Sequence, residues 1–222
     1  MTATDREQVT RALLERYGER SFAEEAEIHL REQPHALYQM LELAALVNAR
    51  VAPGTAVRTF EELRGHRWST AGGVLEAGRD RIDHALRDAG YPEGDAAGIA
   101  TAVTDAALHL QQDHGGDLGG LREDAGHDPV RERELLRHFA DVDDGVVDAF
   151  CREVQVLWDE LLPFADKKAL DAAHRLGLGE DAGALRRLAA DDREYVRLVD
   201  ALVRVRHDEH GYRELQELAG HR

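Results

Sequence analysis

Two kinds of side chain in this sequence, histidine and cysteine, could bind a metal or react. His207 and His210 stand one helical turn apart, a spacing at which two histidines can share a metal ion. No third ligand supports them, so we interpret this segment as a solvated, polar helix end and predict no metal site. The lone Cys151 has apolar neighbours, which favours a buried and unreactive thiol.

A third candidate is the carboxylate of Asp166, which follows Pro163 and begins a predicted helix that stops at Gly177. An aspartate that a loop places at a helix start is available for chemistry. Aspartate is also a preferred N-cap residue, whatever the function of the protein. Both interpretations of Asp166 stay open on the sequence.

Other enzyme signals are missing from the sequence. It contains no glycine-rich phosphate loop, no nucleophile elbow and no Cys–His pair at a recognisable spacing. One cysteine cannot form an intramolecular disulfide, which suggests a reducing compartment, and we expect a cytoplasmic protein. The start, MTATDREQV, has no secretory pattern, and no apolar run approaches a membrane span, so we expect no membrane partner.

The charge balance argues against an ordinary nucleic-acid-binding surface. The chain has 28 Lys and Arg against 44 Asp and Glu, a net charge of −16. Proteins that grip nucleic acid usually present a basic face, because neutralising phosphates supplies much of their affinity. A local basic group remains a candidate, and its members are Arg58, Arg64, Arg67, Arg79 and Arg81. A solvated surface in an acidic protein explains the composition at least as well.

Helical periodicity runs through the chain, and no segment alternates with period two, so we predict an all-α fold of about ten helices. The stretch from Leu135 to Leu178 organises the rest. One short helix ends near Phe139, a connection runs from Ala140 to Gly145, and a longer amphipathic helix follows. A loop then delivers Asp166 to the next helix. This order is a helix–hairpin–helix followed by an aspartate.

That order resembles the endonuclease III-like helix–hairpin–helix DNA glycosylase superfamily (HhH-GPD). The likeness extends from about residue 20 to 180 and includes Leu43–Leu63, Ser69–Gly90, Tyr91–Ala97 and His174–Leu178. It implies a two-lobed fold with the active site in the cleft between the lobes. Residues 22–160 would form a six-helix lobe with the hairpin, and residues 1–21 plus 161–222 a second helical lobe.

The resemblance also implies site residues on the hairpin. The family hairpin approximates Leu-Pro-Gly-Val-Gly-x-Lys-Thr-Ala, and its nucleic-acid-contacting positions fall here on Val142 and Gly145. Val142 keeps the apolar position, whereas Asp141 and Asp143 replace both glycines. Carboxylates repel a phosphate, so we expect that this hairpin does not bind a DNA phosphate as the family hairpin does. Gly145 replaces the lysine that attacks the sugar, so we expect no lyase activity.

The resemblance also implies functional positions outside the hairpin. The family's base-probing glutamine falls near Asn48 and Arg50, which could contact nucleic acid or could be polar residues at the edge of the core. Asp166 matches the aspartate that helps expel a damaged base. The cysteines of the family's iron–sulfur cluster are missing from Tyr195 to Arg222, so we predict no cofactor.

Two hypotheses from different classes follow. The first is a divergent, monofunctional DNA glycosylase of the base-excision-repair type that hydrolyses the N-glycosidic bond with Asp166. The second is a catalytically inactive glycosylase-fold protein that binds a protein or another ligand, with its acidic hairpin facing a basic partner. Asp166 favours the first hypothesis, whereas Asp141, Asp143 and Gly145 favour the second.

Overall fold

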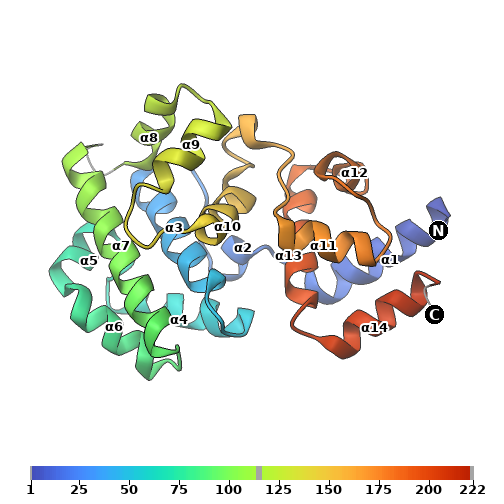
Figure 1. The fold of residues 1–222 in the computed structure, drawn as a ribbon, viewed down its shortest axis with the longest axis horizontal. Coiled ribbons are helices and arrows are strands. Elements are labelled where there is room, and N and C mark those ends of the chain that lie inside the picture. Colours follow the sequence, from blue (N-terminus) through green and yellow to red (C-terminus); the bar gives the residue numbers. More distant parts are fainter. Residues whose placement is uncertain (1, 114–116, 221–222) are drawn as a thin grey trace. The chain divides into compact units, whose positions relative to one another are not determined.

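A computed structural model describes residues 2–113 and 117–220, and every regular element in those ranges is helical (Figure 1). The predicted all-α fold is therefore confirmed. Short helices such as α2, α5 and α12 bring the number of elements above the predicted ten. The elements are α1 (Ala3–Tyr17), α2 (Phe22–Glu25), α3 (Pro34–Asn48), α4 (Pro53–Gly65), α5 (Ala71–Ala77), α6 (Arg79–Asp88), α7 (Glu93–Asp113), α8 (Leu118–Ala125), α9 (Pro129–Leu136), α10 (Asp144–Val154), the 3₁₀ helix η1 (Asp159–Leu161), α11 (Lys167–Arg175), α12 (Ala182–Arg186), α13 (Asp192–Val205) and α14 (Glu209–Leu218).

The chain divides into two compact units. Unit 1 comprises Met1–Phe22 and Leu161–Arg222, and unit 2 comprises Ala23–Glu160. The sequence of unit 2 contains 13 basic and 28 acidic residues, and that of unit 1 contains 15 and 16. Unit 2 therefore has a net charge of −15, and unit 1 a net charge of −1. Almost all of the acidity belongs to the unit that contains the hairpin.

Helix α3 is the centre of unit 2. Pro34 occupies its first turn, where a missing backbone N–H costs nothing, and the residues from Met40 to Leu46 are all buried. An almost wholly apolar helix has to be covered on several sides. Helices α4, α7, α8 and α10 provide that cover. The second hairpin helix, α10, thus packs directly on α3, which ends at Asn48.

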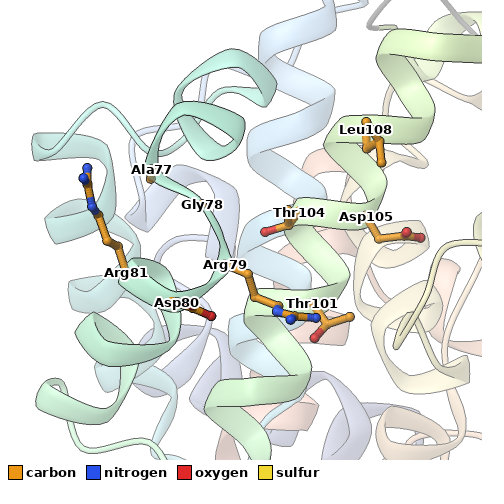
Figure 2. A pocket seen from close by; sticks show the side chains of 9 residues that line it. All are labelled: Ala77, Gly78, Arg79, Asp80, Arg81, Thr101, Thr104, Asp105 and Leu108. Carbon is orange, nitrogen blue, oxygen red and sulfur yellow. The ribbon is translucent and has the colours of Figure 1, made fainter.

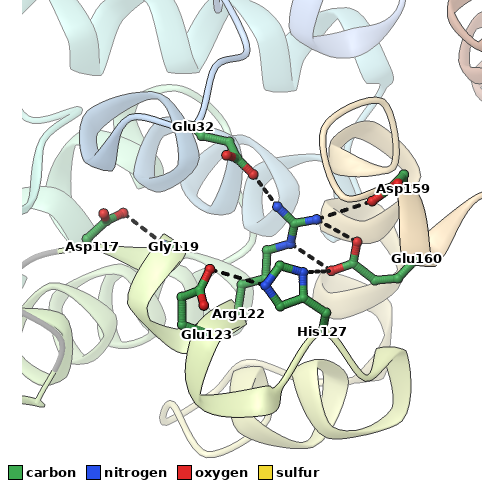
Figure 3. A network of polar contacts seen from close by, with 8 residues as sticks. All are labelled: Glu32, Asp117, Gly119, Arg122, Glu123, His127, Asp159 and Glu160. Atoms are coloured by element: carbon green, nitrogen blue, oxygen red, sulfur yellow. Dashed lines mark hydrogen bonds and ion pairs between the residues drawn. The ribbon is translucent and has the colours of Figure 1, made fainter.

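A polar network around Arg122 joins α8 to two other segments of unit 2 (Figure 3). The Arg122 side chain is only 10% exposed, and its Nε and Nη2 each donate to Glu160 at 2.7 Å. Its Nη1 pairs with Glu32, which precedes α3. Glu132 on α9 is fully buried, and both its burial and its contact with Glu160 raise its pKa to about 8. The neighbouring Arg122 lowers the pKa of Glu160 to about 2.

In unit 1, α13 packs against α1 and α11, and α14 contacts both α1 and α13. The apolar face of α13 includes Tyr195, Leu198 and Leu202, all fully buried in the core of this unit. The N-terminal and C-terminal segments of the chain therefore share one hydrophobic core. This core supports α11, the helix that Asp166 precedes.

Candidate functional site

The hairpin begins earlier than the sequence indicated but keeps its turn. Helix α9 ends at Leu136 rather than near Phe139, and α10 starts at Asp144. Asp141 adopts the left-handed conformation with φ of 58°, which aspartate tolerates better than most residues. Asp143 has an extended backbone and is the N-cap of α10. The turn therefore forms with aspartates at the two positions where the family hairpin has glycines.

Carboxylates occupy backbone N–H groups around this turn. The Ala140 N–H donates to Asp105 Oδ2 on α7 at 2.6 Å, and the Val146 N–H donates to Asp143 Oδ1 at 2.9 Å. The Val142 N–H donates to a backbone carbonyl of the same loop at 3.2 Å. An N–H group engaged in this way cannot also donate to a phosphate oxygen. We call this turn the closed hairpin, because these three N–H groups are engaged within the protein, two of them by acidic side chains.

Asn48 fills the space beside Gly145. Its Nδ2 donates to Asp143 Oδ1 at 3.0 Å, so α3 and the hairpin are linked through the same carboxylate. A Cβ atom added at Gly145 would lie 2.2 Å from Asn48 Oδ1, far closer than atoms pack. The residue at this position is therefore restricted to glycine while Asn48 keeps its place. A lysine here would require Asn48 to move.

Arg50 and the hairpin line one open hollow of about 700 Å³ in unit 2. The Arg50 guanidinium lies 3.3 Å from Asp95 at the start of α7, yet its side chain remains 83% exposed. Val142 is buried, so its side chain supports packing. The hollow is lined by Ala45, Asn48, Ala49, Arg50, Gly94, Asp95, Gly98, Ile99, Ala102, Arg137, His138, Phe139, Ala140, Asp141, Val142, Asp143 and Val146.

The hollow thus unites the sequence candidates of unit 2 with residues that the sequence analysis did not single out. Asn48, Arg50 and Val142 line it, and Gly145 touches Asn48. Asp95 and Asp105 were missed, because neither belongs to a local motif. Both lie on α7, and only the tertiary fold brings Asp105 to Ala140, 35 residues away.

Asp166 belongs to unit 1 and is the N-cap of α11. Its Oδ1 accepts the Ala169 N–H at 2.8 Å, and the residue is only 3% exposed. The capping interpretation is therefore confirmed, and the catalytic interpretation stays a prediction. The adjacent Lys167 is paired with Asp171 on the same helix at 2.8 Å.

Acidic residues accompany three arginines of the candidate basic group. Arg64 donates to the backbone of Ala26 at 2.8 Å and pairs with Glu27. Arg79 and Arg81 line a different hollow of about 530 Å³, where Arg79 extends toward α7 and Arg81 points away from it (Figure 2). Asp80 and Asp105 line the same hollow, so its charges cancel.

Metal and thiol chemistry gain no support from the described residues. No group of three His, Cys, Asp or Glu side chains within residues 2–113 and 117–220 is placed to hold a metal ion. Burial raises the pKa of Cys151 to about 12, so its thiol stays protonated. In the part of the chain that the structure describes, no helix is long and apolar enough to cross a membrane.

Comparisons with known proteins identify the fold. No family model matches the sequence, and no curated protein matches it. Among solved structures, the chain is similar to "Structure of a Trapped Endonuclease III-DNA Covalent Intermediate: Estranged-Adenine Complex". The TM-score is 0.51 at 14% sequence identity, over 92% of this chain and 86% of the other. The chain therefore has an endonuclease III-like, all-α fold, in agreement with the predicted resemblance.

Proposed function

We propose that this protein is a monofunctional DNA glycosylase of the base-excision type, with Asp166 as its catalytic carboxylate. The observation that carries the proposal is the position of Asp166, at the first turn of the helix that follows the helix–hairpin–helix. The similar solved structure is an endonuclease III–DNA complex, which makes DNA the substrate class to test.

The chemistry of the proposal is hydrolysis of the N-glycosidic bond. Water adds to the sugar C1′ while the base leaves with the electrons of the broken bond. The Asp166 carboxylate stabilises the positive charge that develops on the sugar or accepts the proton of the attacking water. With glycine at position 145, the hairpin offers no amine for a Schiff base, so the strand stays intact.

A base-release assay tests this proposal. Labelled duplexes with different damaged bases are incubated with excess protein at low salt and then divided, with and without alkali. We expect one lesion class to give strand breaks only after alkali, which reports an abasic site without lyase activity. The proposal fails if no duplex in the panel loses a base. Breaks without alkali would contradict the monofunctional mechanism.

A second candidate is favoured by the closed hairpin. Asp105 and Asp143 occupy N–H groups of the turn, and unit 2 has a net charge of −15. These observations support a catalytically inactive protein whose hairpin side binds a basic protein partner. A fluorescent poly-lysine peptide tests this candidate. We expect Asp141→Asn to weaken peptide binding, with the exposed Asp192→Asn in unit 1 as a control. Equal binding by both variants would exclude a role for the hairpin.

A further inference from the structure

Unit 1 contains a hollow that the proposed chemistry does not use. It measures about 460 Å³ and lies between α11, the end of α13 and α14. Small-molecule sites commonly span about 300–1,000 Å³, so its size suits a ligand. We call it the α11–α14 hollow, and it is lined by Asp171, Ala172, Arg175, Arg206, Glu209, Tyr212, Arg213 and Gln216.

Three arginines line this hollow. Arg175 lies in the last turn of α11, Arg206 is the C-cap residue of α13, and Arg213 belongs to α14. Cations at helix C-termini are favourable, which explains why Arg175 and Arg206 are basic but not why three arginines line one hollow. Within the described residues, none of the three has a carboxylate partner within ion-pair distance.

The acidic residues at the rim offset these charges only in part. Asp171 is paired with Lys167 at 2.8 Å, and this contact, together with the charges of Arg206 and Arg175, lowers the pKa of Asp171. Glu209 contacts Arg213 through its backbone, since its carbonyl accepts the Arg213 Nε–H at 3.2 Å. The lining therefore carries three positive and two negative charges, one of the latter neutralised from outside.

The charges of the lining arginines affect the pKa values of two neighbouring groups. Burial raises the pKa of Tyr212, Arg175 and Arg206 oppose that rise, and the charge of Asp171 adds a smaller rise. Burial lowers the pKa of His207, and Arg206 and Lys168 lower it further. The Tyr212 hydroxyl donates to the Ala172 carbonyl at 3.4 Å, which holds the ring at the wall of the hollow.

We propose that the α11–α14 hollow binds a phosphate group. A phosphate carries up to two negative charges and several acceptor oxygens, which suits more than one guanidinium fork. A single carboxylate would leave two of the three arginines without a counter-charge. The Tyr212 ring provides a flat wall for the organic part of a phosphorylated ligand. This site does not depend on the proposed glycosylase activity.

Calorimetric titration of the full chain at constant ionic strength tests the site. The probes are inorganic phosphate, a nucleoside 5′-monophosphate, and a short single-stranded oligonucleotide with or without a 5′-phosphate. We expect saturable binding of at least one phosphate-bearing probe in a background of chloride. Preference for the monophosphate indicates a free nucleotide, whereas preference for the 5′-phosphorylated oligonucleotide indicates a strand end. Absence of saturable binding by every probe overturns the proposal.

Two variants distinguish binding in the hollow from non-specific attraction of anions to the protein surface. Arg206→Gln removes one fork and should lower the affinity about tenfold or more, because charge-assisted hydrogen bonds are strong. Arg187→Gln is the matched control, since Arg187 is the exposed C-cap residue of α12 outside the hollow. Its affinity should equal that of the wild type. Thermal unfolding verifies that both variants are folded. Unchanged affinity in Arg206→Gln, or equal losses in both variants, would refute the site.

Discussion

The hairpin in unit 2 and the start of α11 in unit 1 both belong to an endonuclease III-like fold, but they differ in chemistry. At the hairpin, Asp105 and Asp143 occupy backbone N–H groups, and Asn48 fills the space beside Gly145. At α11, Asp166 caps the helix with its carboxylate. A helix–hairpin–helix turn can therefore form with acidic side chains on its N–H groups. The Asp166 carboxylate has a structural role as a helix cap, whatever its chemistry.

We expect the largest effect at Arg122, and it tests whether the stability of acidic unit 2 depends on a buried cation. Arg122→Leu removes the partner of Glu160 and Glu32. Because the largely buried Glu160 carboxylate then lacks its counter-charge, we expect a loss of about 3–5 kcal/mol in the free energy of unfolding. Urea denaturation measures it, with exposed Arg131→Gln as the control. A loss below about 1 kcal/mol, the usual size for a surface pair, would show that the network is a solvated surface feature.

Glu132 provides a pH-dependent test of the same network. Its pKa in the folded protein is raised from 4.5 to about 8, so folding favours the protonated form. Its stabilising contribution is complete below pH 4.5 and is lost as the pH rises toward 8. The lowered pKa of Glu160 acts below this window, since its contribution is lost only as the pH falls from 4.5 toward 2.

We therefore expect the free energy of unfolding of the wild type to fall between pH 5 and 8. The contribution of Glu132 is on the order of 1 kcal/mol for each pH unit crossed. Glu132→Gln removes this titration and should give a flatter profile, measured by urea denaturation across the range. Glu134→Gln changes an exposed residue on the same helix and should follow the wild type. Parallel profiles for all three proteins would contradict the assignment.

A smaller effect tests the closed hairpin. Gly145→Ala places a Cβ against Asn48, and we expect a loss of about 1–3 kcal/mol from this crowding. Asn48→Ala removes the obstruction, so the double variant should be more stable than the sum of the single losses predicts. A double-mutant cycle by thermal unfolding measures the coupling. Additive losses would show that Asn48 does not restrict position 145.

The sequence alone predicts the helices, but it does not predict which polar side chains come together at the hairpin and in the α11–α14 hollow. Pro34, the apolar run from Met40 and the capping tendency of Asp166 are local signals, and the structure confirms all three. The contact of Asp105 with Ala140 depends on how α7 crosses the hairpin, which no short pattern encodes. The grouping of Arg175, Arg206 and Arg213 likewise arises only when three helices pack together.

The smallest expected effect on stability comes from Asp166→Asn. Asparagine caps helices about as well as aspartate, so we expect a change of no more than about 0.5 kcal/mol. Asp191→Asn, at the N-cap of α13, is the matched control for the loss of a capping charge. Equilibrium unfolding should give similar stabilities for the wild type and both variants. A large loss in Asp166→Asn alone would mean that its charge has a structural role beyond the cap.

The same pair of variants tests the central claim most directly, through single-turnover base release from the damaged duplex that the wild type prefers. If Asp166 is the catalytic carboxylate, Asp166→Asn should slow release about 100-fold or more, while Asp191→Asn should match the wild type. Equal rates in all three proteins would contradict the account and leave Asp166 as a helix cap alone.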